Sequence, residues 1–218
     1  GQCMKNFYDR IIKRIIDFVL SLAGIIVLIP VWIILAVAIK IDDPGPVLFK
    51  QKRIARDNKD GTVKYFYILK YRSMKTSTPK DMPTHLLKNP EQYITRVGGF
   101  LRKTSLDELP QIFNIFLGQM AIVGPRPALY NQTDLYEERA KYGANKVRPG
   151  LTGWAQINGR DELLIEDKAR LDGEYVSRMS LLMDLKCFFG TFLSVLRQDG
   201  VVEGGTGSIN NDDANNEQ

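Results

Sequence analysis

The sequence predicts an α/β fold that is mostly helical, forms a single domain and is anchored to a membrane by its N-terminal segment. The first observation is an uncharged apolar run over residues 18–39, long enough as a helix to match the ~30 Å hydrocarbon core of a bilayer. The second is a pair of strand-like segments within residues 47–71, and the third is a series of apolar-rich helical patterns after them. The 218 residues, 44% of them hydrophobic and 25% charged, suit one globular domain.

The scarce residue types exclude several kinds of site. The chain has one histidine, His85, and two cysteines, Cys3 and Cys187, which lie near opposite ends of the sequence. A zinc site needs three or four His, Cys or carboxylate ligands, and a disulfide framework needs more cysteines, so we expect neither. Lys and Arg exceed Asp and Glu by 30 to 25, a mildly basic balance that suits an anionic partner. We expect His85 to be solvated, Cys187 to be a small core residue and nucleic acid not to be a partner.

The apolar run is interrupted by Pro30, and a proline inside a helix removes a backbone hydrogen bond and kinks it. Basic residues flank the run on both sides, within residues 5–14 and 40–53. A spanning helix usually carries its excess of Lys and Arg on the cytoplasmic side only. Two arrangements therefore stay open from the residues alone: one spanning helix, or a re-entrant helix that bends at Pro30 and returns to the same face. Both arrangements hold the rest of the chain at a membrane surface.

The segments after the run predict a β-hairpin and then a series of helices. Residues 47–54 and 62–71 alternate as strands do and are separated by turn residues. The S-x-x-E pattern from Ser105 to Glu108 matches a capping box and predicts a helix that begins near Ser105. The other expected elements are a polar loop at 76–90, a short strand at 120–124, a helix over 128–142, a loop at 148–154 and a helix over 161–177.

The helical pattern over residues 181–196 is apolar except for Asp184 and Lys186. These charges fit a spanning helix poorly, so we expect an amphipathic helix that lies in the core or in the membrane interface. Residues 200–218 are rich in Gly, Asn and Asp, a composition that predicts a disordered tail.

Asp107 and Glu108 are the candidate catalytic pair. In the first turn of a helix, both carboxylates would lie near free backbone N–H groups and the positive end of the helix dipole, which lowers a carboxylate pKa. An anion held in this way is a suitable nucleophile or metal ligand. The alternative interpretation is that the two residues only cap the helix.

Cations form the second half of the candidate site. Guanidinium groups bind phosphate oxygens in pairs, so arginines with a rigid backbone suit a polyphosphate substrate. The alternative for each cation is a surface salt bridge or a contact with a lipid headgroup. The chain contains neither GxxxxGK[ST] nor GxGxxG, so a P-loop or Rossmann site is not expected. The candidate cations are Lys70 and Arg72 at the end of the second strand, Arg102 before the acidic pair, Arg126 between two prolines, and Arg148 before Pro-Gly.

Three segments of the chain resemble the bacterial sugar transferase family, in particular its small monotopic phosphoglycosyl transferases, such as those that initiate bacterial N-linked glycosylation. The segments are KYRSM, RKTSLDELPQIFNIFLGQMAIVGPRP and KVRPGLTGWAQINGR, and they follow an apolar anchor with a central proline. One departure is Ile29 before Pro30, where the family often has serine. The resemblance covers nearly the whole chain. It implies transfer of a sugar phosphate from a UDP-sugar to polyprenyl phosphate with release of UMP, the first membrane step of glycoconjugate assembly.

The resemblance also implies roles for the site residues. Asp107 would be the nucleophile that forms a covalent aspartyl phospho-sugar. Glu108 would help to hold Mg²⁺, the expected cofactor, against the diphosphate. The expected substrate-binding residues are Lys70, Arg72, Arg102, Arg126 and Arg148.

By the same resemblance, residues 1–41 form a basic segment and a re-entrant membrane helix, residues 42–199 a catalytic domain, and residues 200–218 a tail. The catalytic domain would lie on the cytoplasmic face of a bacterial inner membrane. The expected partners are a UDP-sugar, undecaprenyl phosphate and membrane lipid, and the apolar surfaces suit either a homodimer or lipid contact. N-acetylated amino sugars and hexoses both occur in the family, so the sugar stays open. The alternatives to catalysis are a membrane-tethered basic binding protein, and an enzyme of this fold that has lost transfer and only binds nucleotide sugar.

Overall fold

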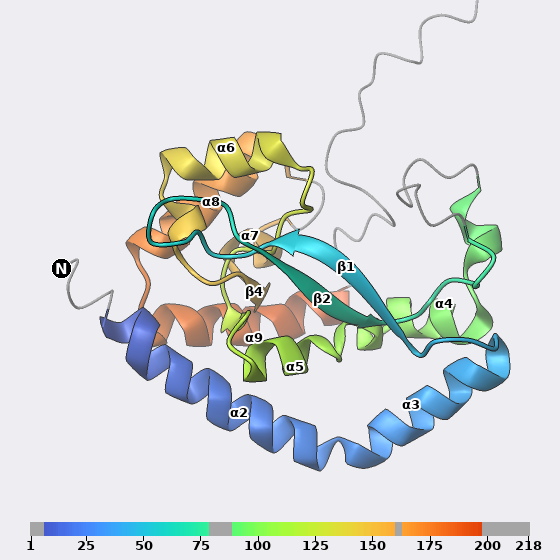
Figure 1. The fold of residues 1–218 in the computed structure, drawn as a ribbon. Helices are drawn as coiled ribbons and strands as arrows, with labels where there is room; N and C mark the ends of the chain where they lie inside the picture. Colours follow the sequence, from blue (N-terminus) through green and yellow to red (C-terminus); the bar gives the residue numbers. More distant parts are fainter. Residues whose placement is uncertain (1–6, 79–88, 160–162, 198–218) are drawn as a thin grey trace, which may run out of the picture.

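The computed structural model describes residues 7–78, 89–159 and 163–197. Figure 1 shows a mixed α/β domain, mostly helical, with a bent pair of N-terminal helices along one side. Helices α6, Thr133–Lys141, and α8, Ile165–Ser177, lie on the opposite side, and a β-hairpin lies between. The expected solvated position of His85 and the expected tail at 200–218 lie outside the described residues.

The N-terminal helices follow one another with a single break. A π-helical turn, Tyr8–Ile12, leads into α2, Lys13–Val27, and then into α3, Ile29–Asp42. The chain is bent by 63° at Leu28. Pro30 lies in the first turn of α3, where its missing N–H leaves no helical hydrogen bond unmade. The expected bend is therefore present, two residues before Pro30.

An aromatic side chain bridges the break. The indole N–H of Trp32 donates to the backbone carbonyl of Ile25 at 3.1 Å, so a group on α3 satisfies an acceptor on α2. Within the described part of the chain, no single helix has the length and apolar composition needed to cross a bilayer. Taken together, the bent pair Tyr8–Val27 and Ile29–Asp42 has both, by length and composition only.

Strands β1, Leu48–Ile54, and β2, Tyr65–Tyr71, form an antiparallel hairpin, which confirms the prediction. Successive side chains on a strand point to opposite faces. Phe66 and Ile68 are buried on the inner face, and Lys70 shares that face with them. The strand period therefore turns Lys70 toward the interior of the domain.

A buried side chain of helix α5, Gln111–Phe116, bonds to the backbone at the free edge of β2. Asn114, which is 1% exposed, accepts from the backbone N–H of Leu69 at 3.0 Å and donates to the carbonyl of Tyr67 at 2.8 Å. The amide thus replaces the missing neighbouring strand and satisfies backbone groups that would otherwise be buried without partners.

Asn114→Leu is expected to destabilise the fold by about 2–4 kcal/mol, because a leucine of similar size leaves two buried backbone groups unpaired. Thermal unfolding of the detergent-solubilised protein measures the loss. The matched control is Asn158→Leu, which removes an exposed amide that donates to the carbonyl of Trp154 and is expected to cost less than about 0.5 kcal/mol. Equal losses in the two variants would contradict the prediction.

The segment before α5 differs from the helix that the capping-box pattern predicts. Helix α4, Arg96–Lys103, ends before it, and Leu106–Glu108 form only a 3₁₀ turn. Ser105 has a φ of 57°, and its side chain makes no capping hydrogen bond. Pro110 has no N–H to donate to the carbonyl of Leu106, so an α-helix started at Ser105 is interrupted in its second turn. The predicted helix start is wrong, and the acidic pair lies in a tight turn between two helices.

Strands β3, Ala121–Val123, and β4, Gly150–Thr152, pair in parallel. The first confirms the strand predicted at 120–124, whereas the second lies in a segment that we expected to be a loop. The strands approach so closely that a Cβ on Gly150 would lie 2.1 Å from the backbone nitrogen of Gly124. Glycine is required for this contact, and the same glycine makes the segment resemble a loop in the sequence.

The helices predicted over 128–142 and 161–177 are present but begin later, at α6 and α8. Leu129 pairs with Arg53 in an isolated β-bridge, so the residues before α6 are held extended. Residues 161 and 162 lie outside the described residues. The remaining helical elements are the 3₁₀ turns Pro90–Tyr93 and Ala144–Lys146, α7, Trp154–Ile157, and α9, Leu181–Arg197.

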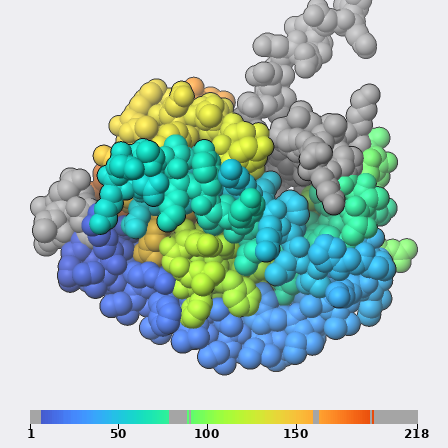
Figure 2. All heavy atoms as spheres, in the orientation of Figure 1, coloured from blue at the N-terminus to red at the C-terminus, as the bar shows by residue number. Residues whose placement is uncertain are grey.

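Helix α9 is apolar on two sides. Met183 and Cys187 are buried in the core, which confirms the expected burial of Cys187. Leu182 and Phe189, in contrast, are 79% and 62% exposed. Figure 2 shows α2 and α3, in blue, as a continuous rim along one edge of the molecule. This rim also carries exposed apolar side chains: Ile15, Val27, Ile34, Val37 and Ile41.

Candidate active site

Glu108 lies between two cations that come from distant parts of the chain. Its Oε1 atom accepts from Nζ of Lys70 on β2 at 2.9 Å and from Nη2 of Arg126 at 2.7 Å. A second contact joins Nη1 of Arg126 to Oε2 at 3.5 Å. The hairpin, the 3₁₀ turn and the turn after β3 therefore meet at one carboxylate.

The small parallel sheet fixes the turn that carries Arg126. The N–H of Gly124 donates to the carbonyl of Thr152 at 2.8 Å, and the N–H of Gly150 donates to the carbonyl of Pro125 at 2.9 Å. Both bonds join the turn to β4, and Pro125 and Pro127 restrict the backbone on either side of Arg126. The guanidinium is thus presented by a rigid backbone, as its flanking prolines predicted.

Asp107 lies beside this ion-pair cluster without a bond to it. In the described part of the chain, its carboxylate has no hydrogen-bond partner. Burial raises the pKa of Asp107, and the adjacent charge of Glu108 adds to the increase. The cations Lys70, Arg102 and Arg126 act in the opposite direction. The lowered pKa expected at a helix N-terminus is therefore wrong for Asp107, because the residue lies in a partly buried 3₁₀ turn.

Glu108 behaves differently from its neighbour. Burial acts to raise its pKa, but the charges and hydrogen bonds of Arg126 and Lys70 outweigh burial and hold the pKa of Glu108 far below its usual range. The two adjacent carboxyls thus differ in kind: Glu108 is a fixed anion in an ion-pair cluster, and Asp107 is a carboxyl without a hydrogen bond to any described residue.

Arg102 completes the group of cations around Asp107. Its Nε donates to the hydroxyl of Ser73 at 2.9 Å, so the guanidinium is held on the side of α4 that faces the acidic turn. Sequence reasoning did not single out Ser73 as a positioning residue, although it lies within the KYRSM segment.

The two other arginines of the predicted site have different partners. In the part of the chain that the structure describes, neither Arg72 nor Arg148 contacts the acidic pair. Arg72 is buried and donates to the carboxylate and the carbonyl of Asp43, just after α3. Arg148 is buried against two aspartates near the start of the chain. Their contact with substrate remains a prediction that this geometry does not support.

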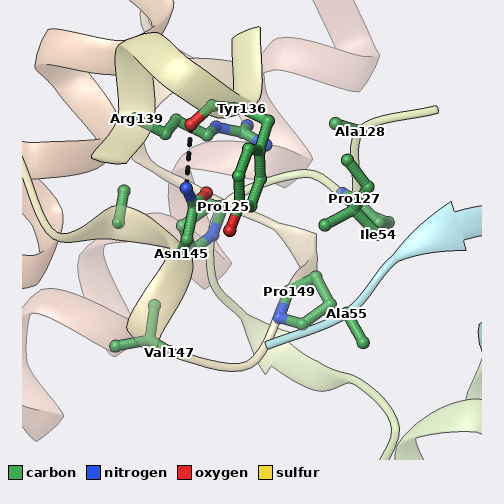
Figure 3. A pocket seen from close by; sticks show the side chains of 11 residues that line it. Ile54, Ala55, Pro125, Pro127, Ala128, Tyr136, Arg139, Asn145, Val147 and Pro149 are labelled. Atoms are coloured by element: carbon green, nitrogen blue, oxygen red, sulfur yellow. Dashed lines mark hydrogen bonds between the residues drawn. The ribbon is translucent and has the colours of Figure 1, made fainter. Parts of the chain in front are cut away.

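A small cavity is lined in part by Pro125 and Pro127, the two prolines that flank Arg126 (Figure 3). Its volume is about 20 Å³, which is room for about one water molecule. Its lining includes Pro125, Pro127, Tyr136, Arg139 and Asn145, and the amide of Asn145 donates to the carbonyl of Tyr136 at 2.8 Å. The cavity is too small for a nucleotide sugar and is therefore not the candidate substrate site.

Among the described residues, no three His, Cys, Asp or Glu side chains gather as they do in a metal site built from protein alone. A divalent cation at the acidic turn would thus need ligands from substrate or water in addition to the carboxylates.

Comparison with known proteins identifies the relatives of this chain. The family model described as bacterial sugar transferase matches residues 8–198. The chain is 39% identical over 190 residues to the UDP-glucose:undecaprenyl-phosphate glucose-1-phosphate transferase of Escherichia coli, an alignment that covers 84% of this chain and 40% of that protein. It is 36% identical over 205 residues to the protein of the same name from Xanthomonas campestris, covering 91% of this chain and 41% of the relative.

A shorter relative aligns over almost its whole length. The chain is 36% identical over 198 residues to an exopolysaccharide production protein of Rhizobium leguminosarum, which covers 86% of this chain and 96% of that protein. The chain spans about two fifths of the length of the Escherichia coli and Xanthomonas campestris relatives. The matched region includes the acidic pair and all of the cations described above, and the chain belongs to the bacterial sugar transferase family.

Proposed function

We propose that this chain transfers a sugar phosphate from a UDP-sugar to undecaprenyl phosphate and releases UMP. The observation that carries the proposal is the carboxylate of Asp107, which has no hydrogen-bond partner among the described residues and lies amid three cations. A carboxylate nucleophile needs an unbonded oxygen, and a diphosphate needs cationic neighbours. The names of the Escherichia coli and Xanthomonas campestris relatives supply the substrate class and make UDP-glucose the first donor to test.

The proposed reaction has two steps at one phosphorus atom. In the first, an oxygen of Asp107 attacks the β-phosphorus that carries the sugar. The new bond joins the carboxylate to phosphorus, the bond to the bridging oxygen breaks, and UMP leaves with the electron pair. In the second, an oxygen of undecaprenyl phosphate attacks the same phosphorus, and Asp107 leaves as a carboxylate. The covalent aspartyl phospho-sugar between the steps conserves the phosphoryl bond energy.

The cations have separate tasks in this scheme. Lys70 and Arg126 are held by Glu108 and so are fixed before substrate arrives, which reduces the reorganisation needed as phosphate charge develops. The positive charge of Arg102 favours the ionised form of Asp107. The proposal assigns these three residues to the diphosphate and makes no such assignment for Arg72 and Arg148.

We propose that the acidic turn holds Mg²⁺. Such an ion is commonly bound by one or two carboxylates together with substrate phosphates and water, and Glu108 supplies one carboxylate for that set. We therefore place Glu108 as the candidate ligand. When bound, Mg²⁺ would supply positive charge that neutralises the diphosphate.

We further propose that the bent helix pair rests in a bacterial inner membrane as a re-entrant hairpin, with the acidic turn on the cytoplasmic face. The exposed apolar side chains along α2, α3 and α9 support this arrangement, because a lipid-facing surface needs no polar cover. A lipid acceptor keeps its phosphate at the interface, so a membrane-level site is also required by the proposed chemistry. A homodimer through the same apolar surfaces remains a prediction.

The experiment that tests the function measures UMP release by the protein in nanodiscs with Mg²⁺, undecaprenyl phosphate and a panel of UDP-sugars that begins with UDP-glucose. Continuous UMP release from one or two donors, dependent on the lipid acceptor, is the expected result. The Escherichia coli relative serves as the positive control for the assay. If the folded chain releases no UMP from any donor while the control is active, the proposal fails and a membrane-tethered binding protein becomes the better interpretation.

Arg102→Met is expected to move the acidic limb of the pH–rate profile to higher pH. The Arg102 cation favours the ionised form of Asp107, so its removal raises the pKa of Asp107 further. Because only the ionised carboxylate attacks, kcat/KM then declines at a higher pH than in the wild type. The matched control is Lys103→Met, an exposed cation on the same helix. Limbs at the same pH in both variants would contradict the assignment of Arg102.

A further inference from the structure

A buried pair of charges joins helix α2 to the small sheet behind the candidate active site. Asp17 on α2 is 2% exposed and Arg148 is 6% exposed. Oδ2 of Asp17 lies 3.1 Å from Nη1 of Arg148, and Oδ1 accepts the backbone N–H of Ile122 in β3 at 3.0 Å. Arg148 also donates from Nη2 to the carbonyl of Asp9 at 3.0 Å. One carboxylate therefore holds both β3 and the residue that leads into β4.

The sheet that this pair joins is very small. Each strand has three residues, and a two-stranded sheet of this size is not stable by itself in water. Parallel pairing is also slightly weaker per residue than antiparallel pairing. Contacts from outside the sheet must therefore keep the two strands together, and the Asp17 carboxylate is a group that contacts both sides.

The same sheet positions Arg126. The turn that carries this residue follows β3 directly and is bonded to β4 through the N–H groups of Gly124 and Gly150. A Cβ on Gly124 would lie 2.5 Å from the carbonyl oxygen of Arg148, so the backbone of Arg148 touches the turn itself. A shift of β4 relative to β3 therefore moves the guanidinium that meets Glu108.

We propose that Asp17 and Arg148 are positioning residues. Together they hold β3 against β4 and thereby keep the Gly124–Pro127 turn where Arg126 meets Glu108. Neither side chain touches the site, so their effect passes through the strand pair. The inference rests on the proposed function, since it concerns the same site. Because Asp17 belongs to α2, seating of the N-terminal helix against the domain becomes a condition for assembling the cations around the acidic turn.

This role differs from a general contribution to stability. Burying two charges costs solvation that their attraction repays only in part, so a buried ion pair is weak evidence for stability. Arg148→Lys keeps the positive charge but removes the planar group that contacts Asp17 and Asp9 at once. The variant therefore tests the geometry of the Asp17–Arg148 contact rather than the presence of a positive charge.

The first test needs no catalysis and uses amide hydrogen exchange of the protein in nanodiscs. In Arg148→Lys, the amides of Gly124 and Gly150 are expected to exchange about tenfold faster, relative to amides of the β1–β2 hairpin. The matched control is Arg170→Lys, the same substitution in an exposed ion pair with Asp167 within α8. The control is expected to leave the two amides unchanged relative to the hairpin. Unchanged relative protection in Arg148→Lys, or equal acceleration everywhere, overturns the proposal.

The second test measures coupling in kcat/KM. Arg148→Lys is expected to lower kcat/KM about tenfold in the wild-type background but less than about twofold in an Arg126→Lys background, because its effect passes through Arg126. Arg170→Lys is expected to leave kcat/KM unchanged in both backgrounds. An equal tenfold loss in both backgrounds for Arg148→Lys overturns the proposal. If the wild type releases no UMP, the proposed function fails. The exchange measurement still decides whether Asp17 and Arg148 hold β3 against β4.

Discussion

Asp107→Asn is expected to lower the rate of sugar-phosphate transfer at least about 10³-fold, because an amide does not replace a carboxylate as the attacking nucleophile. The same substitution is expected to change the stability of the fold by less than about 1 kcal/mol. The Asp107 carboxylate has no hydrogen-bond partner in the described residues, and burial raises its pKa, so a neutral side chain of the same shape fits the turn. If Asp107 is the nucleophile, Asp107→Asn loses activity while the protein stays fully folded.

A measurement without the lipid acceptor separates this chemistry from substrate binding. When the wild type is mixed with its UDP-sugar alone, we expect about one equivalent of UMP and a phospho-sugar on the peptide that contains Asp107. Asp107→Asn is expected to give neither product. The control is Asp134→Asn in the exposed first turn of α6, which is expected to behave as the wild type does. UMP release that survives in Asp107→Asn would make Asp107 a structural residue and exclude the covalent route.

The sequence predicted those elements whose local pattern agrees with their environment. The hairpin has strand alternation and turn residues, and its buried Phe66 and Ile68 follow the period of two. In contrast, the pairing of β4 depends on the close approach of Gly150 to another backbone segment, which no local pattern reports. The capping-box pattern failed for a local reason, because Pro110 interrupts the helix that Ser105 would begin.

In the candidate site, too, local sequence predicts some features, while others depend on contacts between distant residues. Arg126 and Arg148 are both arginines next to proline in the sequence, yet one meets Glu108 and the other is buried against Asp17. The difference depends on contacts between residues that are far apart in the chain, which neither residue's neighbours encode. Lys70 and Arg72 were both named as candidate cations from their place at the end of the second strand, yet only Lys70 meets Glu108, because strand period fixes a side chain's face but not its partner.

Glu108→Gln is expected to reduce both activity and stability, in contrast to Asp107→Asn. The carboxylate binds Lys70 and Arg126 at once, so a neutral amide leaves two cations close together without their shared anion. We expect a loss of about 1–3 kcal/mol in unfolding free energy and of at least about 10²-fold in kcat/KM. The matched control is Glu138→Gln, which breaks the more exposed ion pair with Lys141 and is expected to change neither quantity appreciably.

The pH dependence of this variant identifies how Glu108 acts. Its negative charge contributes to the raised pKa of Asp107, so its removal lowers that pKa and moves the acidic limb of the profile to lower pH. The nucleophile is then ionised over a wider range, and yet the maximal rate is expected to decline. If the variant is slower although its nucleophile is more readily ionised, loss of the charge on Asp107 does not explain the lower rate. The cause is then the lost placement of Lys70 and Arg126, or of Mg²⁺. If placement of Mg²⁺ is part of the loss, Glu108→Gln also needs more Mg²⁺ for its half-maximal rate, whereas an unchanged Mg²⁺ requirement limits the role of Glu108 to the two cations.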